Sequence, residues 1–146
     1  MTLQILAAKE EKETTKARGR AEQRIAEFNA KQKEREARSA QEAATAEEEQ
    51  ISLQEKKFKA RQRVRGAKGG ISISESSTIE VLAETAGQFS RERALTLRAG
   101  LVRSNFLRSQ ASLLRAKGKL SKDFARVEAR STFNRRLLTL ATSTPT

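Results

Sequence analysis

The sequence predicts an all-α protein, and three observations carry this prediction. Strong helix formers such as Ala, Glu, Lys, Arg, Gln and Leu are abundant, and the 146 residues include a single Pro, Pro145. Charged residues make up 33% and aromatic residues only 4%, so few large side chains are available for a private core. Glycines gather at residues 66–70, where a helix can end and the chain can reverse. We expect long helices that pack on neighbouring chains.

The first predicted element is a long charged helix, which we assign to a segment at residues 1–65. From about Leu3 to Arg65 it has no Pro and one Gly, so it would extend on the order of 90 Å at 1.5 Å per residue. Its sparse apolar residues fall on a strict seven-residue spacing typical of a coiled coil, and these are Ala30, Ala37, Ala44, Ile51 and Phe58. Such a narrow seam of mostly small residues buries little surface, so we expect this helix to need neighbours.

The second predicted element is a glycine- and serine-rich corner at residues 66–76. Residues 71–74 alternate apolar and polar side chains, which predicts a short extended link. Ser77 with Glu80 three positions later has the spacing of a capping box, which predicts the start of the next helix. The predicted hinge residues are Gly66, Gly69 and Gly70.

A helical hairpin is predicted at residues 77–141. Its first arm, antiparallel to the long helix, runs from about Ser77 to Ala116, and a shorter third helix follows Gly118, with Ser121 as its cap. Residues 142–146 would be a frayed tail. The first arm is apolar on two sides, with Leu95, Val102, Phe106 and Leu113 on a second face, so we expect it to lie between neighbours. The predicted oligomer interface comprises Ile79, Leu82, Ala86, Phe89, Leu97 and Leu101.

The net charge of +12 suits a polyanionic partner such as nucleic acid or an acidic protein surface. A solvated helical surface that happens to be basic is the plainer alternative. Seven positive charges follow an acidic run, and no aromatic residues alternate with them for base stacking, so sequence-specific readout is not indicated. These candidate contacts to DNA or an acidic partner are Lys56, Lys57, Lys59, Arg61, Arg63, Arg65 and Lys68.

Catalysis is not indicated by any motif. The chain has no Cys and no His, which removes thiolate chemistry and the commonest general base and metal ligand. The glycine-rich corner lacks the pattern of a phosphate-binding loop. We therefore predict no enzymatic activity, no catalytic residue, no cofactor and no metal site. No apolar run approaches the length of a membrane-spanning helix.

The residues from about Gln41 to Arg115 resemble the small internal virion proteins of short-tailed bacteriophages, also called core or ejection proteins. The similarity is strongest in the string RGAKGG at Arg65 to Gly70, at the serine pair Ser76 and Ser77, and around Gly87, Gln88 and Phe89, with Arg91 and Glu92 following. The chain departs from this family in lacking a long apolar N-terminal segment and in having short C-terminal material.

The resemblance implies a structural role inside the particle. Such proteins are packaged near the portal, leave the capsid at infection and help to build a conduit for DNA across the host envelope. The expected partners are therefore further copies of the chain, portal, tail or core proteins, genomic DNA contacted without sequence preference, and the host envelope after ejection. The expected location is the capsid interior or the portal-tail region of the virion, and the host cell envelope after ejection. Two alternatives stay open, namely a head-to-tail connector or tail component and a non-catalytic basic helical protein that binds nucleic acid.

Overall fold

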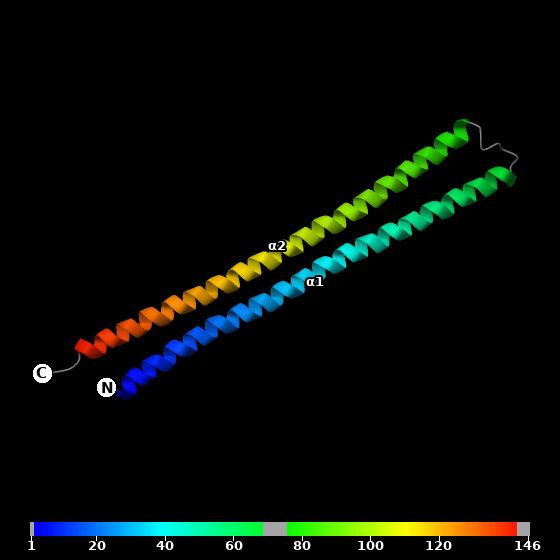
Figure 1. Ribbon diagram of the computed structural model, residues 1–146. Helices are drawn as coiled ribbons and strands as arrows, with labels where there is room; N and C mark the ends of the chain where they lie inside the picture. The colour runs from blue at the N-terminus through cyan, green and yellow to red at the C-terminus, as the bar shows by residue number, and fades with distance from the viewer. Residues whose placement is uncertain (1, 69–75, 143–146) are drawn as a thin grey trace. The chain divides into compact units, whose positions relative to one another are not determined.

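The computed structural model describes residues 2–68 and 76–142, and these residues form two long helices. Helix α1 spans Thr2–Lys68 and helix α2 spans Ser76–Thr142, each with 67 residues, and the described residues contain no strand (Figure 1). The predicted all-α class and the predicted long first helix are confirmed. The chain divides into two compact units, which are described separately. Unit 1 comprises Met1–Glu34 with Arg108–Thr146, and unit 2 is Arg35–Leu107.

The prediction of a separate third helix is wrong. Helix α2 continues through Gly118 and Ser121 to Thr142. A glycine inside a helix costs only about 1 kcal/mol relative to alanine, which the rest of a long helix easily outweighs. Gly118 also has a packing role here, because a Cβ atom added to it would lie 2.5 Å from the Cβ of Ala26.

The predicted corner also begins too early. Gly66 lies within α1, which ends at Lys68, so Gly66 is not a hinge. The reason is again that a single glycine does not end a helix of strong helix formers. The other two predicted hinge residues, Gly69 and Gly70, and the predicted extended link at residues 71–74 lie outside the described residues. Helix α2 begins at Ser76, one residue before the predicted start.

Small residues make the buried face of α1. In unit 2 the buried residues Ala37, Ala44 and Ile51 recur every seven residues, as predicted. In unit 1 Ala8 and Ala30 are fully or almost fully buried and lie 22 residues apart, twice the eleven-residue repeat that keeps one face of a nearly straight helix in register. Both periods lie close to the 3.6 residues of a helical turn, at about 3.5 and 3.67 residues. The same face of α1 therefore stays covered along each unit.

The two helices approach each other closely where a glycine on one meets an alanine on the other. In each of the three pairs the residue numbers sum to 144, so each unit has the same antiparallel register. A Cβ atom added to any of these glycines would overlap the Cβ of the alanine, so a side chain there would force the backbones apart. The pairs are Gly19 with Ala125 and Gly118 with Ala26 in unit 1, and Gly100 with Ala44 in unit 2.

Polar contacts between the helices of unit 1 agree with this register. The pKa of Glu22 is held below its usual value, chiefly by a hydrogen bond that the Ser121 hydroxyl donates to it and then by Arg18. Exposed ion pairs contribute little to stability, so such contacts select the pairing more than they stabilise it. The ion pairs across the helices join Arg115 Nη1 to Glu34 Oε1 and Arg136 Nη1 to Glu11 Oε2, each at 2.7 Å.

In unit 2 two ion pairs of Arg93 agree with the register. Its Nη1 lies 3.7 Å from Glu48 Oε1, and its Nη2 lies 3.5 Å from Glu55 Oε2. The two glutamates are seven residues apart and so lie on one face of α1, where the arginine reaches both. Nearby, the rings of Phe58 and Phe89 pack in a tilted arrangement with centroids 6.1 Å apart. Shifting α2 by a turn would break all three contacts.

Glycine substitutions test the close approach of the helices. We expect Gly100→Ala to destabilise the chain by about 1–3 kcal/mol, because the new methyl group overlaps Ala44. The matched control is Gly87→Ala, where nothing lies within 4 Å of the added Cβ, and it should stabilise α2 by about 0.5–1 kcal/mol. Thermal unfolding followed by circular dichroism measures both. Equal effects of the two variants would contradict the described packing.

Ser104 offers a second test of the buried seam. Its side chain is fully buried, and its hydroxyl has no hydrogen-bond partner among the residues that the structure describes. An unsatisfied buried hydroxyl costs about 1–3 kcal/mol, so Ser104→Ala should raise the free energy of unfolding by about 1 kcal/mol. Ser112→Ala is the control, since the exposed Ser112 donates to the Ser109 carbonyl oxygen and its loss should be nearly neutral. A destabilised Ser104→Ala variant would contradict this account.

The lowered pKa of Glu55 predicts that the stability of the folded chain depends on pH. Its pKa lies below the usual 4.5, first because Lys59 Nζ donates a 2.6 Å hydrogen bond to the carboxylate, and then through the charges of Lys59, Arg93 and Lys56. A carboxyl whose pKa is lowered by folding stabilises the folded chain above its unfolded pKa, and this contribution disappears as the pH falls through the folded pKa. We expect Glu55→Gln to melt below the wild type near neutral pH, and the difference to close below pH 4.5. A difference that stays constant during an acid titration would refute this.

Candidate functional site

The basic run predicted near the end of α1 does not form one surface. Its seven members lie in unit 2 and are exposed, apart from the half-buried Lys59, which is bonded to Glu55. Successive members are one to three residues apart, so at about 100° per residue they spread around the exposed sides of the helix and do not share one face. Arg65 and Lys68 lie in the last turn of α1, where positive charge interacts favourably with the helix dipole. The structure thus gives two of these residues a local structural role.

The six predicted interface residues of α2 divide into two groups. Leu82, Ala86 and Phe89 are half-buried, and Phe89 packs on Phe58 of the same chain. The other three are exposed, and these are Ile79 at 53%, Leu97 at 39% and Leu101 at 52%. The prediction that these residues bind another copy stays a prediction.

A second apolar surface of α2 is more exposed than the predicted oligomer interface. Each of its side chains is more than half exposed, and the values for Leu113 and Phe124 are 68% and 70%. The spacings of seven, four and three residues place each group on one helical face. We call this surface the outer seam and define it in unit 1 by Leu113, Leu120, Phe124 and Val127, and in unit 2 by Leu95, Val102 and Phe106.

The outer seam lies on a different side of α2 from the buried seam. At about 100° per residue, Leu113, Leu120 and Val127 point within about 40° of one another. Helix α2 is therefore apolar on two sides, as the sequence predicts, and only one side is covered by α1. The buried residues of α2 in the described part of unit 1 point roughly 120–180° away from the outer seam, and these are Ala111, Gly118 and Ala129.

A strongly basic cavity lies between the helices in unit 1. It has a volume of about 320 Å³, and its lining residues are Lys16 and Arg20 of α1 with Lys122 and Arg126 of α2. The residues of each pair are four positions apart, which places them on one face of their helix. Across the helices the residue numbers of Arg20 and Lys122, and of Lys16 and Arg126, sum to 142. This value is close to 144, the sum of the residue numbers in each glycine and alanine pair, so these positive charges face each other across the two helices.

One carboxylate partly balances this cavity. Lys16 Nζ lies 2.7 Å from Glu13 Oε1, and this hydrogen bond is the main reason why the pKa of Glu13 lies below its usual value. The charges of Lys16, Arg20 and Lys12 lower the pKa of Glu13 further. Among the described residues, Lys122 and Arg126 have no ion-pair partner.

Sequence reasoning missed this cavity because its residues are distant in the chain. Each helix carries a basic series that alone resembles an ordinary solvated face, and only the antiparallel register brings the two series together. The available signal was the recurrence of basic residues at helical spacing, at Lys12, Lys16 and Arg20 and again at Lys122, Arg126 and Arg130.

Other kinds of site find little support in the described part of the chain. No group of three or more acidic side chains there could hold a metal ion. Within residues 2–68 and 76–142, no helix is long and apolar enough to cross a membrane. The four lining side chains of the cavity in unit 1 are all positively charged groups of the kind that can donate hydrogen bonds to an anion.

No protein-family model, curated protein or solved structure matches the chain.

Proposed function

We propose that the chain is a non-catalytic structural protein that assembles with further copies of itself through the outer seam of α2. The observation that carries this proposal is that small side chains are buried between the helices while large apolar side chains are exposed, the reverse of an ordinary protein core. The buried seam consists largely of Ala and Gly, while Leu113, Leu120 and Phe124 point outward and are more than half exposed.

The energetics favour covering the outer seam. Burying a Leu or Phe side chain stabilises a structure by about 1.5–3 kcal/mol, whereas an alanine methyl group contributes less than about 1 kcal/mol. The chain gains little from its own buried seam, so the larger gain is available only against another surface. A second copy is a suitable partner, because an apolar series at spacings of three, four and seven residues matches a helix with the same series.

The particle role that we propose is that of an internal core or ejection component near the portal-tail DNA path. It rests on the resemblance at Arg65 to Gly70, Ser76 and Ser77, and Gly87 to Phe89, and on the basic helical character of the chain. In this role packing of the helices would form the assembly, and positive charge would tolerate or guide the passing phosphate backbone. Detection of the chain by mass spectrometry in purified phage particles tests it, and its absence from them would count against it.

Charge substitutions in the outer seam test assembly. We expect the double variant Leu113→Glu/Leu120→Glu to reduce the assembly to monomers, because it places two charges in a buried apolar contact. Light scattering gives the mass, and circular dichroism shows whether the helices persist. The matched control is the double variant Leu53→Glu/Val64→Glu on α1, where both side chains are more than half exposed and lie outside the outer seam, and it should leave the mass unchanged. A monomeric wild type, or equal effects of the two changes, would overturn the proposal.

A further inference from the structure

We propose that the basic cavity of unit 1 binds phosphate groups of a nucleic-acid backbone. Lys16, Arg20, Lys122 and Arg126 supply four positive charges around one cavity of about 320 Å³. The proposal deepens the particle role proposed above, on which its choice of ligand rests, because it names the residues that would contact the phosphates. The cavity lies on a different face of α2 from the outer seam, so binding and assembly can be tested separately.

The positive charges around the cavity repel one another. Like charges that face each other across two helices destabilise the pairing, and Glu13 is the one carboxylate bonded to a lining residue among those that the structure describes. A phosphate oxygen in the cavity would accept hydrogen bonds from both helices and would replace repulsion with attraction. Arginine and lysine are both common phosphate ligands.

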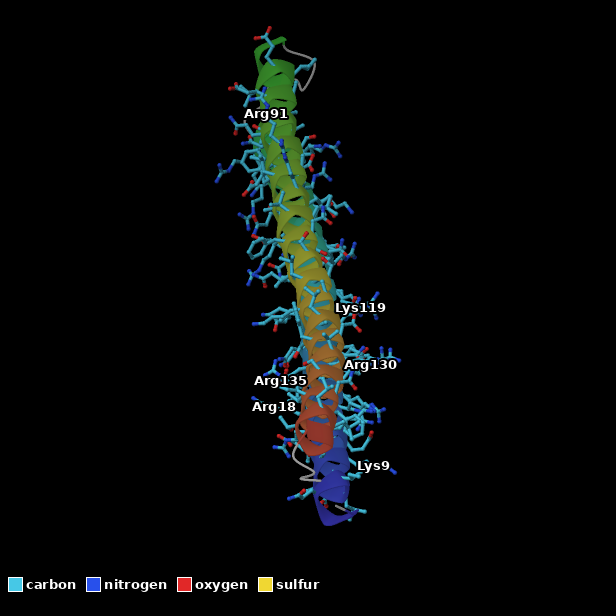
Figure 2. All side chains as sticks on the ribbon, turned by 90° about the vertical axis from the view of Figure 1, so that its left-hand side faces the viewer. Lys9, Arg18, Arg91, Lys119, Arg130 and Arg135 are labelled. Carbon is cyan, nitrogen blue, oxygen red and sulfur yellow. The ribbon has the colours of Figure 1, made fainter. Side chains whose placement is uncertain are left out.

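The basic surface extends beyond the cavity along both helices. Lys9 and Lys12 continue the series along α1, and Lys119 and Arg130 continue it along α2. Figure 2 shows Lys9, Lys119 and Arg130 extending to the same side of the ribbon. Lys9 and Arg20 are eleven positions apart, which corresponds to about 16 Å at 1.5 Å per residue. Duplex DNA carries one negative charge per about 1.7 Å of its axis, so several phosphates of one DNA molecule can contact the basic series along this length.

The aromatic side chain beside the basic surface does not indicate recognition of particular bases. Phe133 lies beside this series, and Lys12 Nζ lies over its ring at 4.3 Å from the centroid. The ring face that the ammonium group covers is not free to stack on a base. Binding should therefore depend on phosphates and on salt, and it should not depend on sequence.

The experiment compares two triple variants of the full chain by fluorescence anisotropy with a duplex DNA of random sequence, over a series of salt concentrations. Arg20→Gln/Lys122→Gln/Arg126→Gln should weaken binding, and the slope of log K against log salt should fall by about 1 for each lost phosphate contact. The control removes the same charge from unit 2 and should change the affinity less. Equal losses in the two variants would overturn the proposal, since net charge alone would then explain binding. The control variant is Arg38→Gln/Arg91→Gln/Arg98→Gln, at exposed basic residues of unit 2 that are not among the predicted DNA contacts.

Three further measurements separate the alternatives. Glu13→Gln removes the carboxylate that competes for Lys16, so it should strengthen DNA binding, and unchanged or weaker binding would count against the site. Binding of anionic lipid vesicles that is lost in the first triple variant, with DNA binding intact, would overturn the nucleic-acid assignment. Light scattering on each variant shows whether assembly persists, so failure of this site is distinguishable from failure of the proposed assembly.

Discussion

The close contact between glycine and alanine is the constraint on which the rest of this structure depends. A methyl group on Gly19, Gly100 or Gly118 would overlap the Cβ of the opposing alanine. No ordinary side chain can occupy those positions while the helices stay at this separation. The contact therefore fixes both the separation of the helices and the register in each unit.

This constraint determines where the large apolar side chains can go. A seam that consists mostly of small residues excludes most Leu and Phe side chains from the contact between the helices, and many of them lie on the outer faces instead. The chain thus buries little apolar surface of its own and exposes an ordered series on α2. Exposed apolar surface of this kind is typical of interaction sites.

The same register brings charges together. Ion pairs such as Arg115 with Glu34 and Arg93 with Glu48 place opposite charges across the helices. In the basic cavity the register instead places like charges of the two helices around one space, with Lys122 beside Arg20 in the alignment. Favourable pairs at several positions stabilise an alignment that is locally unfavourable at one, and the proposed phosphate site lies at that unfavourable position.

The sequence by itself determined that the chain is helical, that its first helix is long, and that Ala37, Ala44 and Ile51 form a buried seam. These properties follow from local propensity and from periodicity, which a sequence displays directly. Sequence reasoning misjudged Gly66 and Gly118 as breaks, because the cost of a glycine must be weighed against packing that is not local. Only the tertiary structure decided which residues meet across the two helices. The basic cavity depends on residues about a hundred positions apart, and their meeting is set by the register of the glycine and alanine contacts.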